Sequence, residues 1–157
     1  MPSVEQSLDI SAPPSTVWSI LADPSLVPKL IPDVISNEVN PPGMATLGQK
    51  GHTIGKIAGR RVEFFTEITE IVPNKKLVLT QRPGGLFKTF SGTLSIEPSK
   101  KGTRATQKFE YEPSMGYLGK VLSNILVNRT IKKNTKAFLT NVKELAELKE
   151  MPKQAAS

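Results

Sequence analysis

The chain has 157 residues, of which 38% are hydrophobic, and this length fits one domain of ordinary size. Such a chain buries roughly 68–70% of the surface that its unfolded form exposes, so it can build a core without disulfides or metals. Cysteine is absent, which excludes a disulfide scaffold and thiolate metal sites, and the single histidine, His52, excludes a multi-histidine site. We expect one domain over residues 1–150 and a frayed tail at 151–157, with no metal and no cofactor.

The net charge of the chain indicates which kinds of partner it attracts. A net charge of +7 favours acidic partners such as anionic lipid head groups or nucleic acid. The first ten residues carry Glu5 and Asp9 but no basic residue, which is unlike a secretory signal. No apolar run approaches the roughly 20 residues that a transmembrane helix needs. We therefore expect a soluble, cytoplasmic protein.

The first predicted elements are a strand and two short helices. Between Val4 and Ser11 apolar and polar residues alternate, which is typical of a strand with one buried face. Pro13 and Pro14 then suit the start of a short helix, because proline lacks an N–H that the first helical turn would leave unpaired. A second short helix is predicted over Ser25–Ile31, before the next proline.

The middle of the chain predicts a sheet. From Val34 to Tyr111, short β-prone runs alternate with turn residues, and about six strands fit at a spacing suited to an antiparallel meander. The alternation of polar and apolar residues in the last two of these runs indicates a sheet with one wet face and one covered face.

Residues Met115–Lys149 contain no proline and predict a helix of about 50 Å. Its apolar residues form two stripes on different sides. One stripe comprises Val127, Ile131, Phe138, Val142 and Leu145, with Thr135 in line, and the other comprises Leu118, Val121, Leu122, Ile125 and Leu126. A straight helix cannot bury both stripes against one sheet. We therefore expect a kink, a bulge or a separate helical piece near Val127–Thr130.

This order of elements has a simple packing solution, in which the sheet curls and the long helix lies across its concave face. Four segments carry a resemblance: residues 10–24 (ISAPPSTVWSILADP), 31–34 (IPDV), 116–122 (GYLGKVL) and 139–147 (LTNVKELAE). With these segments the chain resembles the START-like, or SRPBCC, helix-grip superfamily, and within it the polyketide cyclase/dehydrase and lipid-transport group. The resemblance implies an α+β helix-grip fold, a curved antiparallel sheet of about seven strands (β-α-α-β6-α) around the C-terminal helix with an internal cavity.

A cavity of this kind would be lined by the large apolar residues of the inward strand rows and of the first helix stripe. The predicted ligand-binding residues are Phe64, Phe65, Leu79, Phe90, Gln107, Phe109, Ile131, Thr135, Phe138 and Val142. We assign Trp18 to packing behind the cavity. Polar residues interrupt the inward rows at Gln6, Gln107, Thr66 and Gln81. A buried amide must form hydrogen bonds with backbone, water or ligand. Each of these polar side chains therefore either makes an ordinary hydrogen bond in the core or orients a ligand in a pocket.

Candidates for catalysis are few. His52 is the default acid or base near neutral pH, but no partner that would orient it is visible in the sequence, which favours an exposed or structural histidine. Glu63 and Glu67 lie four residues apart in a strand, about 13 Å at 3.3 Å per residue. A paired-carboxylate hydrolase needs about 5–9.5 Å. We assign no catalytic residue.

The best interpretation is a protein that binds or transports an apolar small molecule, such as a lipid, an isoprenoid or a polyketide-like compound. One alternative is an enzyme similar to polyketide aromatase/cyclases or dehydratases, and whether the chain is an enzyme stays open. Another is a module that docks on a membrane or a partner and resembles an accessory subunit of carbon monoxide dehydrogenase.

The C-terminal part of the chain bears on which partners the protein binds. Basic residues outnumber acidic ones from residue 117 onward, and a solvated helix face explains this as well as contact with an anionic membrane or an acidic partner does. Aromatic residues do not interleave with them, which disfavours nucleic acid. We expect a monomer or a weak dimer.

Overall fold

The computed structural model of the protein describes residues 3–57, 59–83, 87–113 and 124–156. In chain order, the elements are β1 (Ser3–Ile10), α1 (Pro14–Leu21), the 3-10 helix η1 (Pro24–Leu26), α2 (Val27–Leu30), β2 (Val34–Asn40), β3 (Lys50–Ile57), β4 (Arg60–Val72), β5 (Lys76–Gln81), β6 (Phe87–Ser99), β7 (Gly102–Pro113) and α4 (Asn124–Ala156).

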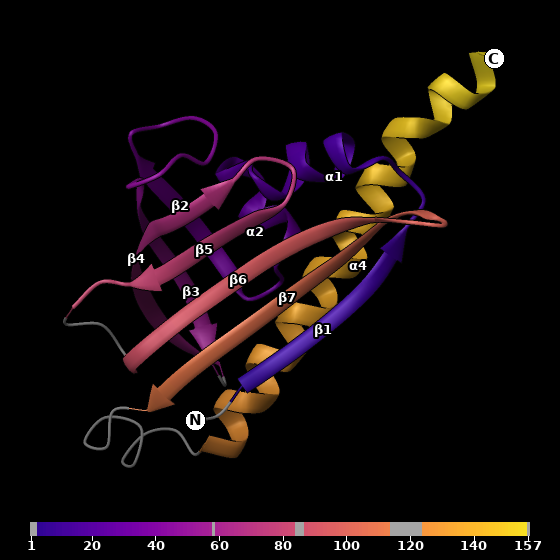
Figure 1. Cartoon of the computed structure of the whole chain (residues 1–157). Helices are drawn as coiled ribbons and strands as arrows, with labels where there is room; N and C mark the ends of the chain where they lie inside the picture. The colour runs from indigo at the N-terminus through magenta and orange to yellow at the C-terminus, as the bar shows by residue number, and fades with distance from the viewer. Residues whose placement is uncertain (1–2, 58, 84–86, 114–123, 157) are drawn as a thin grey trace.

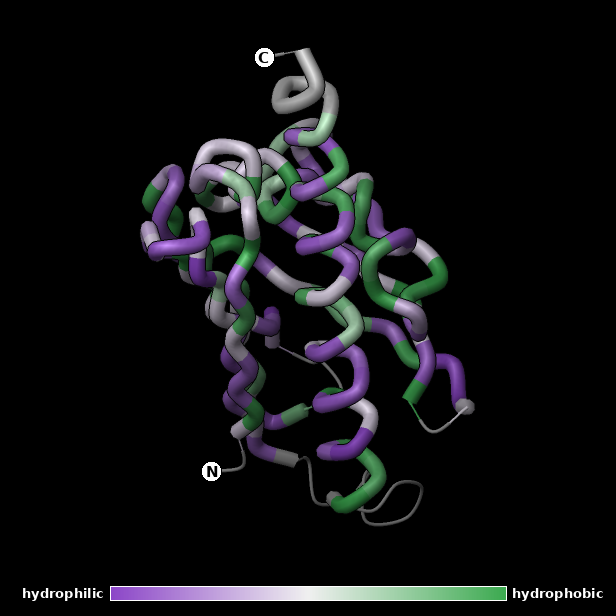
Figure 2. The backbone as a smooth tube through the Cα atoms, turned by 90° about the vertical axis from the view of Figure 1, so that its right-hand side faces the viewer, coloured by the Kyte–Doolittle hydropathy of each residue, from purple (hydrophilic) through white to green (hydrophobic). Residues whose placement is uncertain are grey.

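The seven strands form one antiparallel sheet in the order β1-β7-β6-β5-β4-β3-β2. The sheet curves around α4, and α1 and α2 lie at one end of the groove (Figure 1). Hydrophilic and hydrophobic segments alternate along α4 in Figure 2, as expected for a helix with one face on a sheet and the other in water. The predicted α+β fold, a curved antiparallel sheet around the C-terminal helix, is confirmed.

Helix α1 begins at Pro14, as the two prolines predict, and buries Val17, Ile20 and Leu21. Trp18 of the same helix is half-buried and packs against the core beside these residues. The segment predicted as one second helix is split into η1 and α2. Asp23 caps the start of η1, because its carboxylate accepts hydrogen bonds from the backbone N–H and the hydroxyl of Ser25.

The buried residues form two clusters. The larger one lies under α1, between the first strand and the middle of α4, and includes Ile10, Ile20 and Leu139. The smaller one lies at the start of α4 and comprises Ile57, Val62, Phe87, Tyr111 and Val127. The region between the two clusters holds the candidate site.

The predicted break at Val127–Thr130 is wrong. Helix α4 is continuous from Asn124 through these residues. Val127 is fully buried, and Asn128 Nδ2 donates a hydrogen bond to the Tyr111 hydroxyl at 3.0 Å, so the first turns already lie on β7. Most of the second stripe, Leu118, Val121 and Leu122, falls outside the described residues. Its described members, Ile125 and Leu126, are 71% and 39% exposed.

Candidate ligand cavity

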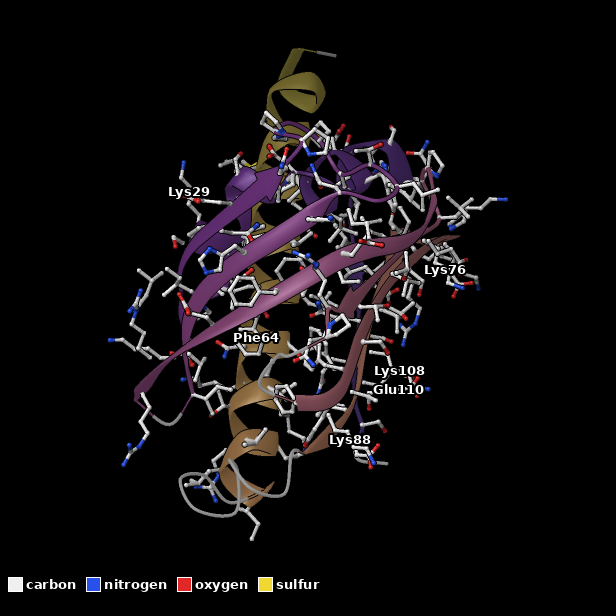
Figure 3. The ribbon with its side chains drawn as sticks, turned by 90° about the vertical axis from the view of Figure 1, so that its left-hand side faces the viewer. Lys29, Phe64, Lys76, Lys88, Lys108 and Glu110 are labelled. Carbon is white, nitrogen blue, oxygen red and sulfur yellow. The ribbon has the colours of Figure 1, made fainter. Side chains whose placement is uncertain are left out.

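A cavity of about 240 Å³ lies between the concave face of the sheet and α4, and it is partly open to solvent. Its wall is mostly apolar and draws on the short helices, on strands β2 to β7 and on α4. Phe64, labelled in Figure 3, projects from β4 toward α4 and forms part of this wall. Small-molecule sites usually have about 300–1,000 Å³, so this cavity suits a small ligand or one that reaches out through the opening.

Small residues on β3 form part of the cavity wall. Gly51, Thr53 and Gly55 occupy alternate positions of the strand, so they share the face that lines the cavity. A Cβ atom at Gly51 would lie 2.8 Å from the Oγ1 atom of Thr66, and one at Gly55 would lie 2.7 Å from the carbonyl oxygen of Asp33. Glycine therefore makes room for the Thr66 side chain at the first position and lets the backbone of the α2–β2 connection approach at the second.

Most of the predicted lining residues meet at this cavity. Those found in its wall are Phe64, Leu79, Phe90, Gln107, Phe109, Ile131, Thr135 and Phe138. Two parts of the wall were not predicted from the sequence: the row of small residues on β3, and the part contributed by the short helices, β2 and the connection after it. This second part includes Leu21, Val27, Ile31, Val34 and Val39, together with Ala45 of the β2–β3 connection.

Two predicted residues lie elsewhere. Phe65 is on the outer face of β4, 38% exposed, and its ring stacks on His52 with the centroids 4.6 Å apart. Neighbouring residues of a strand point to opposite faces, so Phe64 and Phe65 cannot both line one cavity. Val142 is fully buried in the larger core cluster, one helical turn beyond Phe138, where the space between helix and sheet is filled.

The polar residues on the inward rows serve different purposes. Gln81 is bonded to the backbone of Phe87 through both ends of its amide, at 2.7 Å and 3.1 Å, and so fastens β5 to the start of β6. Thr66 lines the cavity. Gln6 is half-buried on β1 and does not reach the wall. Gln107 lines the cavity, is only 6% exposed, and its Oε1 atom has no hydrogen-bond partner among the described residues.

The α2–β2 connection is tied to α4 beside the cavity. Lys133 Nζ lies 2.9 Å from Asp33 Oδ2, and Asn134 Nδ2 donates to the same oxygen at 3.0 Å. Asn141 Nδ2 donates to the carbonyl oxygen of Leu30 at 2.8 Å. Asp33 and Asn134 are themselves part of the wall, so these bonds fix one side of the cavity to the helix.

Comparison with known proteins assigns the family. Residues 1–147 match the family described as polyketide cyclase / dehydrase and lipid transport. The chain belongs to this family. The resemblance noted in the sequence is thereby confirmed. No curated protein matches the sequence.

Solved structures share the fold of this family member. TTHA0849 from Thermus thermophilus is 23% identical with a TM-score of 0.78, over 94% of this chain and 98% of that one. A START superfamily protein from Mycobacterium smegmatis is 15% identical with a TM-score of 0.74, over 93% and 97%. The di-domain ARO/CYC StfQ from the steffimycin biosynthetic pathway is 16% identical with a TM-score of 0.75, over 94% of this chain and 51% of StfQ.

Ionisable groups are scarce in the cavity of this cyclase/dehydrase and lipid-transport family member. Among the described residues of its wall, only Asp33 and Lys56 can ionise. His52 lies on the outer face of β3, where Nε2 is 3.2 Å from Glu63 Oε1, and 36% of its side chain is exposed. The arrangement offers shape and apolar contact to a bound molecule, and one wall residue, Gln107, has an amide oxygen without a partner among the described residues. Within the described ranges, no helix combines the length and apolarity needed to cross a membrane.

Proposed function

We propose that the protein binds and carries an apolar small molecule, such as a lipid, an isoprenoid or a polyketide-like compound, between the sheet and α4. The observation that carries this proposal is the mostly apolar cavity of about 240 Å³, with Asp33 and Lys56 as the ionisable groups of its described wall. The ligand contacts the predicted residues that meet there, namely Phe64, Leu79, Phe90, Gln107, Phe109, Ile131, Thr135 and Phe138.

The aromatic part of the wall supports a ligand with flat or flexible apolar surface. The rings of Phe64, Phe87, Phe90 and Phe109 follow one another at centroid distances of 6.2, 5.2 and 5.3 Å. A molecule that covers these rings removes apolar surface from water, which is worth roughly 25 cal/mol per Å² before the cost of association. Binding of this kind depends on shape and area rather than on a charged anchor.

Native mass spectrometry of freshly purified protein, with solvent extraction of the bound material, tests this proposal directly. We expect an apolar small molecule that co-purifies and is released on denaturation. A matched pair of variants tests whether the ligand binds in the cavity. Thr135→Leu places a larger side chain on a buried wall residue, whereas Thr140→Leu makes the same change at an exposed position of the same helix.

We expect Thr135→Leu to lower the affinity for the neutral probe N-phenyl-1-naphthylamine at least tenfold, because the new side chain occupies ligand space. Thr140→Leu is expected to leave it unchanged. Purified protein without any apolar ligand, together with no binding of the probe, would contradict the carrier function.

An enzyme of the cyclase or dehydratase type is the alternative that the family description favours. Such an enzyme needs a group that moves a proton inside the cavity, and Asp33 is the described wall carboxylate. Its carboxylate is already engaged by Lys133 and Asn134, which supports a positioning role over proton transfer. Turnover of an aromatic polyketide mimic by wild type, lost in Asp33→Asn while the probe still binds, would favour the enzyme.

Contact with an anionic membrane is a second function, supported by the start of α4. Ile125 is 71% exposed there, and Arg129 and Lys132 follow on exposed positions of the next turns. An apolar side chain with basic neighbours suits an anionic bilayer. We expect wild type to float with anionic liposomes at low salt and Ile125→Asp to float less. Leu148→Asp, a change of the same kind at a 59% exposed position near the other end of the helix, is the control. Equal flotation of all three proteins would contradict membrane contact.

A further inference from the structure

We propose that the ligand carries a hydroxyl group, and that this group hydrogen-bonds the side-chain amide of Gln107 inside the cavity. The inference rests on the proposed carrier function and narrows its ligand class to neutral, mostly apolar alcohols. Gln107 is 94% buried, since only 6% of it is exposed, and it belongs to the cavity wall. Its Oε1 atom has no partner within the part of the chain that the structure describes.

The fold supplies no partner for this oxygen among the described residues. Gln107 is paired with Leu94 on β6, and its neighbours on the same face of β7 are Ala105 and Phe109, so the surroundings on these two strands are apolar. Gln6 lies opposite on β1, but its side chain gives the Gln107 oxygen no hydrogen bond. A buried amide oxygen without a partner is destabilising, and native proteins keep few such atoms.

Other buried polar side chains near the cavity are engaged in holding the fold together. The buried Gln49 donates to the carbonyl oxygen of Pro41 at 2.8 Å and anchors the loop before β3. Thr135 donates its hydroxyl hydrogen to the carbonyl oxygen of Ile131 at 2.7 Å. The Gln107 oxygen makes no such bond to the described residues, so the fold leaves this buried acceptor unsatisfied.

The chemistry of the amide selects the class of partner. An amide has an oxygen that accepts and an NH₂ group that donates, and a hydroxyl group can both donate and accept. A hydroxyl therefore satisfies Gln107 whichever way its amide is turned. A hydrocarbon offers neither bond. A carboxylate would bring a buried charge, and the one cationic residue of the described wall, Lys56, is exposed and shares the outer row of β3 with His52, so it offers no buried counter-charge. The geometry thus favours an alcohol over a hydrocarbon or a fatty acid.

The experiment compares two small molecules with equal numbers of heavy atoms, 1-decanol and undecane, as competitors of N-phenyl-1-naphthylamine. For wild type, we expect 1-decanol to compete about tenfold better than undecane does, after correction for their different water solubilities. Tenfold corresponds to about 1.4 kcal/mol, the order of one buried hydrogen bond. Gln107→Leu removes the amide at similar volume and should abolish the preference by weakening 1-decanol alone.

Two further variants isolate the amide. Gln6→Leu makes the same change on the neighbouring strand outside the wall and should keep the preference. Gln107→Met repeats the test with a flexible side chain if Gln107→Leu does not fold, which circular dichroism and thermal unfolding will show. An equal loss of both competitors in Gln107→Leu would mean that Gln107 only shapes the cavity and would overturn the inference.

The outcomes separate this inference from the proposed function. If wild type binds the probe and both competitors without preference, for example because water alone satisfies Gln107, the hydroxyl assignment is wrong and the carrier function stands. If the probe does not bind and no apolar molecule co-purifies, the carrier function fails and the assignment fails with it.

Discussion

The space between the sheet and α4 is filled under α1 and hollow farther along, although the same sheet and helix enclose both parts. In the filled part, Ile10, Ile20 and Leu139 are at most 2% exposed and pack against one another in the larger core cluster. In the hollow part, the inward row of β3 carries Gly51 and Thr53 instead of large apolar residues. In this protein, small residues on one strand thus face the open part of the groove, whereas large apolar residues fill the part under α1.

The two parts also differ in how the helix is attached. In the filled part α4 is held mainly by packing of apolar side chains, with a hydrogen bond from the backbone N–H of Ser11 to Glu147 at its edge. Beside the hollow part the polar contact of Asp33 with Lys133 holds α4, and at the start of the helix the smaller core cluster and the bond of Tyr111 with Asn128 hold it. This arrangement leaves the wall of the cavity in place without filling it.

The largest expected effect separates the two parts by stability. Leu139→Ala in the filled part should lower the free energy of unfolding by about 2–5 kcal/mol, because it leaves a void in close-packed surroundings. Leu79→Ala in the wall of the hollow part should cost clearly less, because Leu79 is half-buried and borders space that is already open. Urea denaturation measures both. Equal losses would mean that the hollow part is packed as densely as the filled one.

A smaller effect is expected at the tie between β7 and α4. Tyr111 is fully buried, and its hydroxyl oxygen accepts the hydrogen bond from Asn128. Tyr111→Phe keeps the ring and removes this bond, so we expect a loss of about 1 kcal/mol in the free energy of unfolding. Adding Asn128→Ala to this variant should cost less than Asn128→Ala does in wild type. Additive losses would show that the two side chains do not interact.

The pH dependence of stability sharpens the comparison at the filled end. A hydrogen bond from Lys143 and another from the backbone N–H of Ser11 lower the pKa of Glu147 below its ordinary value. The pKa is therefore lower in the folded than in the unfolded state. The stabilisation is fully present above the unfolded value of about 4.3 and is lost as the pH falls through the lower folded value.

Glu147→Gln should therefore cost about 0.5 kcal/mol at pH 7, the order of a partly exposed ion pair, and less near pH 3, below the unfolded pKa. Urea denaturation at the two pH values measures the difference, with the same change at the exposed Glu144 as the control. A loss from Glu147→Gln that is equally large at both pH values would contradict the role of the charge.

The sequence predicts the fold well because the fold depends on patterns. Three patterns predict the architecture: the alternation of polar and apolar residues on the strands, the prolines at the start of α1, and the apolar stripe of the long helix. The face of β4 was also readable, since Glu63 and Glu67 share the parity of Phe65 and mark it as the outer row. The sequence does not show where Val142 lies along the length of the groove. A stripe of apolar residues identifies the buried face of a helix, but not whether each residue of that face meets packed core or open space.

The glycines of β3 and the ties to α4 were harder to predict. Gly51, Thr53 and Gly55 occupy alternate positions of a strand. Because all three are small and none is strongly hydrophobic, this alternation does not identify which face of the strand is buried. The contacts of Asp33 with Lys133 and of Tyr111 with Asn128 join residues far apart in sequence, so they follow from the tertiary arrangement alone.

The smallest expected effect concerns His52, which lies behind the hollow part on the outer face of β3. Its ring stacks on Phe65 and approaches Glu63, and all three side chains are substantially exposed. His52→Ala should therefore change the free energy of unfolding by no more than about 0.5 kcal/mol. The affinity for N-phenyl-1-naphthylamine should stay the same, because the cavity is lined by the opposite face of the strand and carrying a ligand requires no proton transfer. If wild type turns over a polyketide mimic and His52→Ala does not, with the probe still bound, the protein is an enzyme that uses His52. This result would also show that the outer face of β3 contributes to the function of the hollow part.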